Sequence, residues 1–171
     1  GLEFYAALGV MLLAFPAILL AILMVAALGP GLYQLMIAVA VAQTPVFSRV
    51  CRATILTIVQ SEFVVAAHAL GTSNLRIVVR HVLPNALGVI VVQGALATAM
   101  TIGYVGALSF IGLGVQPPQA DWGTMVSDAS NHVFESPYLA IFPGAAITVS
   151  VLCFNFVADG LIDSDGWPHP A

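Results

Sequence analysis

The chain contains no lysine and few charged residues of any kind. Its basic residues are four arginines, its acidic residues number eight, and charged side chains make up 7% of the 171 residues, whereas 60% are hydrophobic. A soluble domain carries about 25% charged residues, so this composition excludes a domain that covers itself with a water-compatible surface and predicts a membrane protein. The formal net charge of −4 gives no support to nucleic-acid binding, which needs a basic surface.

Motifs for catalysis, metal binding and nucleotide binding are also missing from the sequence. Cys51 and Cys153 stand alone, without a CxxC pair or a Cys/His cluster, and are expected to be small packing residues. No GxxxxGK[ST] loop, HExxH pair or GxSG serine occurs, so we expect no catalytic residue, no metal site and no cofactor in this chain. Ion-coupled transporters usually carry carboxylates or histidines inside the membrane. Because the long apolar runs have none, a secondary transporter and an intramembrane enzyme are the weaker alternatives.

Four apolar segments are long enough to cross a membrane as helices. A spanning helix needs about 20 apolar residues, and no charged residue occurs between Phe4 and Ser48. Gly29-Pro30-Gly31 divides that run, because proline and glycine favour a reversal over a continuing helix. The predicted spans are 5–28, 32–56, 85–113 and 138–157. We therefore expect an all-α, polytopic transmembrane helix bundle that forms one domain over residues 1–171 and lacks an N-terminal portion.

The two long connections between spans carry opposite charge. The connection 114–136 holds acidic residues and no arginine, namely Asp121, Asp128 and Glu135. All the basic residues lie within or just before the connection 58–84, namely Arg49, Arg52, Arg76 and Arg80. Because positive residues favour the cytoplasmic side of a membrane, we expect 58–84 in the cytoplasm, 114–136 outside the cell, and both ends of this fragment in the cytoplasm.

The arginine-bearing connection has the pattern of two short helices. The first is predicted over 61–70, with one apolar stripe formed by Phe63, Ala66, Ala67 and Leu70. Gly71 is a natural helix stop, and Thr72 or Ser73 can cap a second helix. The second helix has an apolar face formed by Leu75, Val78, Val79 and Val82. Pro84 suits the first turn of the third span. Such an amphipathic helix can dock in a groove of another protein, and lipid headgroups are the alternative contact.

The residues of this connection resemble a known signature. Ala66-Ala67-x-x-x-Gly71, followed after nine residues by His81-x-Leu83-Pro84, resembles the cytoplasmic EAA motif of ATP-binding cassette (ABC) importer permeases. Val65 and His81 depart from the signature's usual glutamate and isoleucine. Further segments resemble the peptide/nickel subgroup, and its second, C-type permease: Leu13-Ala14-Phe15-Pro16, Leu28-Gly29-Pro30-Gly31, Leu108-Ser109-Phe110-Ile111-Gly112-Leu113-Gly114-Val115-Gln116-Pro117-Pro118, Trp122-Gly123 and Phe142-Pro143-Gly144.

The resemblance implies a type I importer permease with six helices per subunit, of which four are present here. It implies three kinds of partner in a bacterial cytoplasmic membrane: a second homologous permease, two ATPase subunits that bind ATP and Mg, and an extracytoplasmic substrate-binding protein. Transport of short peptides by alternating access would follow, with nickel or glutathione as alternative cargo. The implied ATPase-coupling residues are Phe63, Ala66, Ala67, Leu70, Gly71, Arg76, Arg80, Leu83 and Pro84.

Two further groups of residues are expected to have a role in transport. The polar side chains of the third span are candidates for the translocation path, although hydrogen bonds between helices explain them equally well: Gln93, Thr98, Thr101 and Ser109. The start of the acidic connection is a candidate contact for the binding protein, with anchoring of the tryptophan at the membrane interface as the alternative: Asp121, Trp122 and Gly123.

Overall fold

The computed structural model describes residues 16–164, and every regular element in that range is a helix. The helices are α2 (Ala17–Leu28), α3 (Leu32–Val59), α4 (Glu62–Ala69), α5 (Asn74–Ile77), the π-helical turn η1 (Val78–Val82), α6 (Leu83–Phe110), α7 (Trp122–Ser130) and α8 (Tyr138–Ser164). The described range contains no strand. The predicted all-α fold class is therefore confirmed.

Three helical stretches are long and apolar enough to cross a membrane. They are Leu32–Val59, Asn74–Phe110 and Tyr138–Asp163. They correspond to the predicted spans 32–56, 85–113 and 138–157, with each helix longer than expected. The first predicted span, 5–28, falls partly outside the described residues. Its described part, α2, has 12 residues and so extends over about 18 Å.

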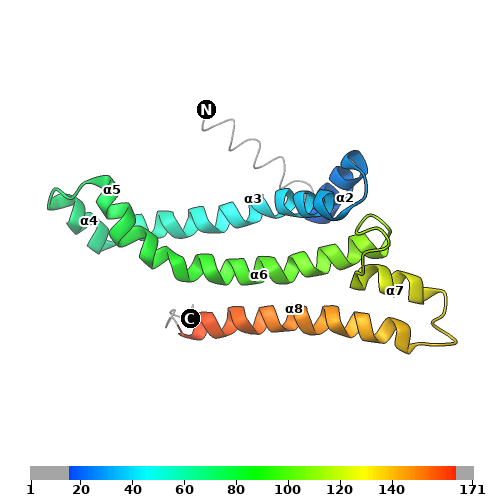
Figure 1. Ribbon diagram of the computed structural model, residues 1–171. Helices are drawn as coiled ribbons and strands as arrows, with labels where there is room; N and C mark the ends of the chain where they lie inside the picture. The colour runs from blue at the N-terminus through cyan, green and yellow to red at the C-terminus, as the bar shows by residue number, and fades with distance from the viewer. Residues whose placement is uncertain (1–15, 165–171) are drawn as a thin grey trace.

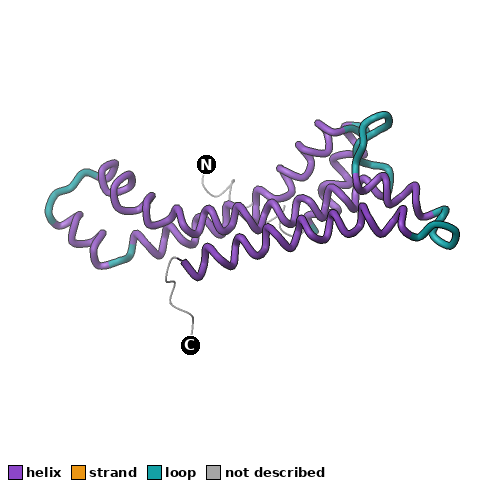
Figure 2. Tube along the Cα trace, turned by 60° about the horizontal axis from the view of Figure 1, so that its bottom comes forward, coloured by secondary structure: helices purple, strands orange, loops and turns teal. Residues whose placement is uncertain are grey.

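The helices form an antiparallel bundle with α6 at its centre. α6 packs against α3 on one side and α8 on the other, while α2 packs beside α3. The connections gather at the two ends of the bundle (Figure 2). A core cluster joins α2, α3 and the last turns of α6, formed by Ala21, Val25, Leu35, Ala38, Val39, Ala42 and Leu108. We call the end with residues 58–84 the arginine-bearing end and the end with residues 111–137 the acidic end.

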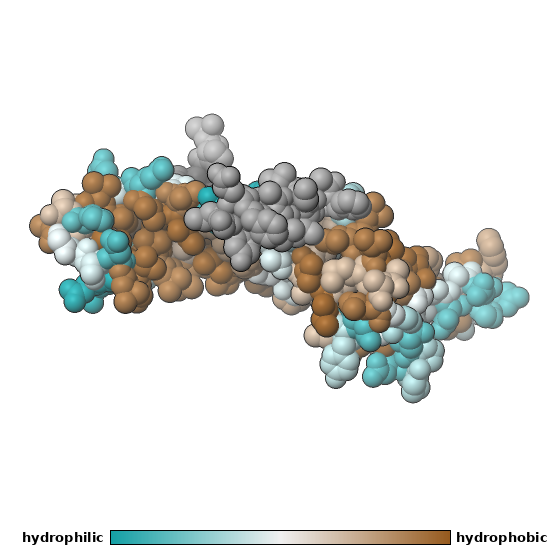
Figure 3. All heavy atoms as spheres, turned by 90° about the horizontal axis from the view of Figure 1, so that it is seen from above, coloured by the Kyte–Doolittle hydropathy of each residue, from teal (hydrophilic) through white to brown (hydrophobic). Residues whose placement is uncertain are grey.

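Hydrophobic side chains cover most of the bundle's long sides. In the view of Figure 3 hydrophobic side chains predominate among the described residues between the two ends, and hydrophilic side chains gather toward those ends. Only 6% of the apolar stretch of α8 is buried within the chain. A surface of this kind is stable only against lipid or other apolar helices, because burial of apolar area is what stabilises it. The chain is a multi-pass membrane protein.

The helix that precedes the predicted third span is not separate from it. Pro84 lies in the first turn of α6, as predicted, but α5, η1 and α6 follow one another without a break over 37 residues. Pro84 has no N–H to donate to the carbonyl of Arg80. The chain widens just before it into a π-turn, in which the Leu83 N–H donates to the Val78 carbonyl. A π-turn beside a proline lets the helix continue across the missing bond.

The π-turn also changes which side chains face inward. The predicted apolar face of Leu75, Val78, Val79 and Val82 is mostly exposed, since only Val82 of these is buried. Ile77 takes the inward position instead and is 5% exposed. Ile77 and Val82 are five residues apart, which an i→i+5 winding brings close to one face. The sequence pattern assumed ordinary α-helical spacing and did not identify Ile77 as a side chain that packs inward.

Candidate functional site

A short helix, α4, lies across the arginine-bearing end of the bundle (Figure 1). Ser61 occupies its N-cap position with extended backbone angles, and Glu62 follows in the first turn, where a negative charge suits the helix dipole. At the other end, Gly71 has φ +79°. Its N–H donates to the His68 carbonyl at 3.0 Å, and the Thr72 N–H donates to the Ala67 carbonyl at 3.2 Å. These two bonds are a Schellman motif, so the sequence signal at Gly71 marks a true helix end.

A small cluster of buried side chains fixes α4 to the long α5–α6 helix. Val64 packs against Ile77 and Val82, all at 5% exposure or less, with Ile58 and Ala67 beside them. The Phe63 ring also contacts the His81 ring, with centroids 6.4 Å apart. Each buried aliphatic side chain contributes about 1.5–3 kcal/mol. An eight-residue helix is marginal by itself, so this cluster holds α4 in a fixed position.

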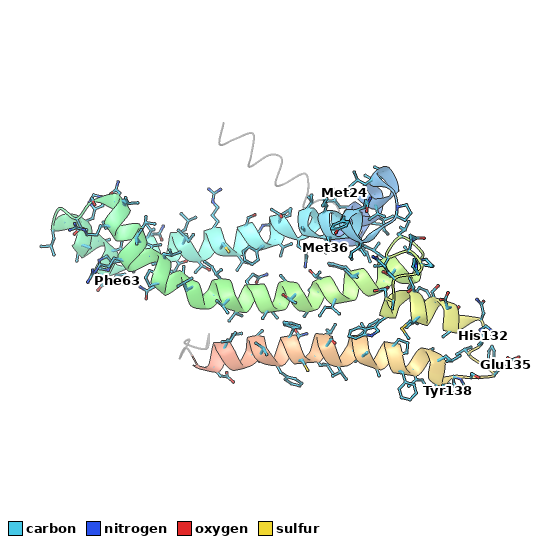
Figure 4. All side chains as sticks on the ribbon, viewed as in Figure 1. Met24, Met36, Phe63, His132, Glu135 and Tyr138 are labelled. Atoms are coloured by element: carbon cyan, nitrogen blue, oxygen red, sulfur yellow. The ribbon has the colours of Figure 1, made fainter. Side chains whose placement is uncertain are left out.

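The opposite side of α4 is largely exposed, although the Phe63 ring reaches His81 from its edge. Phe63 and Ala66 are exposed, and Leu70 is 87% exposed. Ala67 is the member of the predicted stripe that turns partly inward. Leu75, just beyond the turn, is 75% exposed. Figure 4 labels Phe63 at this end of the bundle. The structure therefore presents an apolar surface on a fixed short helix.

Arginines lie beside this apolar surface. Arg76 and Arg80 are exposed and line a shallow depression together with Ser73, Leu75 and Val79. Two like charges four residues apart on a helix repel by a few tenths of a kcal/mol. Their proximity therefore favours an anionic or acidic partner. Leu83 and Pro84, the last residues of the signature, are also exposed at the start of α6.

The polar residues of α6 have different surroundings. Gln93 lines a small cavity between α2, α3 and α6, next to Gln43. Thr101 lines a different cavity, between α6, α7 and α8. Thr98 donates its hydroxyl to the Gly94 carbonyl at 2.8 Å, within its own helix. Ser109 is 1% exposed. Gln93 and Thr101 thus line different cavities.

Ser109 is enclosed by two glycines at the acidic end. A Cβ added at Gly123 would lie 2.7 Å from the Ser109 Cβ and would collide with the Gly106 carbonyl oxygen. A Cβ at Gly114 would lie 2.6 Å from the Ser109 Cα. These contacts are too close for any other residue. Gly114 and Gly123 therefore let the connection fold back over the end of α6.

Asp121 and Trp122 begin α7 at this same place. The Asp121 carboxylate accepts a hydrogen bond from the Thr124 N–H at 3.1 Å and so caps the helix, while the Thr124 hydroxyl donates to the Asp121 carbonyl at 2.8 Å. Trp122 is 45% exposed, whereas Gly123 is buried. Of the three residues expected to contact a binding protein, only Trp122 presents a large exposed side chain.

Sequence reasoning missed the polar contact that sets the register of α3 and α6. The Gln43 side chain donates to the Ala97 carbonyl at 3.3 Å. The sequence did hold a signal for this contact: Gln43 is an amide within an apolar run, and such a group is costly in lipid unless it is hydrogen-bonded. No three His, Cys, Asp or Glu side chains in the described range are placed to share a metal ion.

The bundle defines a multi-pass helical membrane protein with an exposed short helix at one end and an acidic connection at the other. The chain belongs to the family of binding-protein-dependent transport system inner membrane components, because the sequence model of that family matches residues 3–164. The resemblance drawn from the residues of the 66–84 segment is thereby confirmed at the level of the family.

Named relatives come from two transport systems. The chain is 44% identical to the dipeptide transport system permease protein DppC of Alkalihalophilus pseudofirmus over 153 aligned residues. The alignment covers 90% of this chain and 50% of the relative. The chain is also 42% identical, with the same coverage, to the glutathione transport system permease protein GsiD of Escherichia coli and of Shigella flexneri. The chain therefore spans about half the length of the curated relatives it matches.

Proposed function

We propose that this chain is a permease subunit of an ATP-driven importer that moves short peptides across the bacterial cytoplasmic membrane by alternating access. The similar proteins are named for a dipeptide and for glutathione, and both cargoes are short peptides. Nickel chelates are the alternative cargo. A second permease, two ATPase subunits and an extracytoplasmic substrate-binding protein complete the proposed assembly.

The observation that carries the proposal is the presentation of α4. Its inner side is buried against Ile77 and Val82, and its outer side exposes Phe63 and Leu70. An amphipathic helix with an unpartnered apolar side fits a hydrophobic groove on another protein. Because α4 is attached to α6 through a packed cluster, a partner that moves α4 also moves the central helix of the bundle.

The position of this end relative to the membrane favours a protein partner over lipid. Gln43 is bonded to Ala97, so Arg49 on α3 lies level with about residue 91 on the antiparallel α6. From that level, Arg76 is about 15 residues further along the helix, or roughly 22 Å. If Arg49 marks the inner membrane interface, as the positive-inside tendency indicates, α4 and Arg76 extend well beyond the headgroups. Acidic residues of the ATPase then suit Arg76 and Arg80 better than lipid phosphates do.

The chain supplies motion and no chemistry in this proposal. ATP and Mg belong to the partner ATPases, since the sequence has no phosphate-binding loop and no lysine. Closure of the ATPase dimer would shift α4, and α6 would follow because Val64 of α4 packs on Ile77 and Val82 and because α5, η1 and α6 form one continuous helix. The cavities beside Gln93 and Thr101 are where helices α3, α6 and α8 can separate as the bundle opens.

Uptake by the assembled complex in lipid vesicles tests the proposal. A labelled dipeptide should accumulate only with ATP, and Leu70→Ser should weaken retention of the ATPase about tenfold or more, since burying a leucine contributes about 1.5–3 kcal/mol. Leu139→Ser is the matched control, because Leu139 is 45% exposed at the acidic end, and should leave retention unchanged. Uptake that survives inactivation of the ATPase but collapses with the ion gradient would establish a secondary transporter instead.

A further inference from the structure

The most exposed large hydrophobic side chain of the described residues is Phe134, at 101% exposure. It lies in the connection between α7 and α8, beside Val133, which is 39% exposed. Backbone hydrogen bonds hold this connection in shape: the Glu135 and Ser136 N–H groups donate to the His132 carbonyl at 3.1 and 2.8 Å, and the His132 N–H donates to the Ala129 carbonyl at 3.0 Å. The phenyl ring is thus presented by an ordered turn.

This turn projects beyond the membrane-facing part of the bundle. Gly106 lies beside Ile147, since a Cβ there would be 3.2 Å from the isoleucine Cδ1, and Gln43 is bonded to Ala97. By this register Tyr138 extends about seven residues, or roughly 10 Å, past the level of Leu32, where α3 begins. Figure 4 shows His132 and Glu135 further out than Tyr138. Tyr138 has the depth of an interfacial aromatic, and Phe134 lies outside it.

The charge around Phe134 argues against two possible occupants. The connection carries Asp128 and Glu135 and no arginine. Anionic lipid headgroups repel acidic side chains, so the membrane surface is a poor partner. A second copy of the same turn would place like charges together, which is costly at an interface. A surface with lysine or arginine around an apolar pocket complements both the acidic charge of the turn and the exposed Phe134 ring.

We propose that Phe134 is the anchor through which the acidic end binds a soluble extracytoplasmic protein, which offers an apolar pocket rimmed by basic side chains. The proposal rests on the proposed function, in which that partner is the substrate-binding protein. Aromatic side chains dominate binding when they are buried at the centre of an interface. Glu135 and Asp128 form the rim of the contact and steer the encounter. Asp121 and Gly123 serve to cap α7 and to close it on α6.

Binding of the purified dipeptide-binding protein to the complete complex in lipid nanodiscs tests this assignment. Phe134→Ser should weaken binding at least about tenfold, as loss of an aromatic anchor does. Glu135→Lys should slow association and change its dependence on salt. Phe156→Ser is the control, because Phe156 is 69% exposed on the apolar α8, and it should leave binding unchanged. Basal ATP hydrolysis should be the same in all variants, which shows that the complex remains assembled.

Three results would overturn the assignment. Unchanged binding by Phe134→Ser, with ATP-driven uptake intact, would refute the anchor and leave the proposed function standing. Quenching of Phe134→Trp fluorescence by lipid-borne quenchers, with no response to the binding protein, would show that the side chain enters the membrane. Failure of the unaltered complex both to bind the protein and to take up dipeptide with ATP would refute the proposed function itself.

Discussion

Replacement of Gly71 tests whether the end of α4 is needed for docking. The residue has φ +79°, and a Cβ added there would meet nothing within 4 Å. The penalty for alanine is therefore conformational rather than steric, and an L-residue in this region costs about 1–2 kcal/mol. That energy corresponds to a factor of about 5–30 in an equilibrium. The equilibrium between closed and open Schellman hydrogen bonds, which end on the His68 and Ala67 carbonyls, would shift toward the open form by that factor. Leu70 would then lose its fixed position.

The assay is the affinity of the ATPase subunits for the membrane complex. Gly71→Ala should weaken it about 5–30-fold, whereas Gly71→Asn should weaken it less, because asparagine tolerates the left-handed region. Gly94→Ala is the control, since Gly94 lies inside α6 with nothing within 4 Å of its Cβ position. Equal affinities for Gly71→Ala and Gly94→Ala, or an asparagine as harmful as the alanine, would refute the reasoning.

Three further substitutions test the packing at the two ends. Ile77→Ala should loosen α4 from α6 by about 2–5 kcal/mol, seen as faster amide exchange in α4 with α8 unchanged. Gly123→Ala should displace α7, at a cost of about 1–3 kcal/mol for overpacking, and lower the melting temperature of the complex, whereas Gly160→Ala, which has open space, should not. Asp121→Ala should remove the cap of α7, a loss of about 0.5–2 kcal/mol, and Asp121→Asn should restore most of it; equal exchange rates in α7 for both would contradict the cap.

Local signals in the sequence predicted the elements well where one residue type has one physical role. Gly71 marks the end of α4 because a left-handed residue is needed there. The uncharged runs marked the long helices because lipid excludes charge. The cap of α7 had a signal that went unused: Asp121 is followed three residues later by Thr124, and the two bond to each other.

Contacts between distant residues could not be predicted from one sequence. Ser109 was a candidate for the translocation path, but Gly114 and Gly123 pack over it. The spacing of these residues in the sequence does not indicate that either glycine contacts Ser109. The inward position of Ile77 depends on a π-turn, which shifts the helical register by one residue. Pro84 gave the only local cue to that turn. The same cue is ordinary for a helix start, so the sequence could not distinguish a new helix from a widened turn.

The central claim is that the partner ATPase drives the bundle through α4. Its most direct test is disulfide cross-linking in the assembled complex, after Cys51 and Cys153 are replaced by serine. We predict that Leu70→Cys forms a cross-link with a cysteine in the ATPase surface groove, and that Phe134→Cys does not. A Leu70→Cys side chain that fails to cross-link, and that reacts in intact cells with a membrane-impermeant thiol reagent, would contradict the claim.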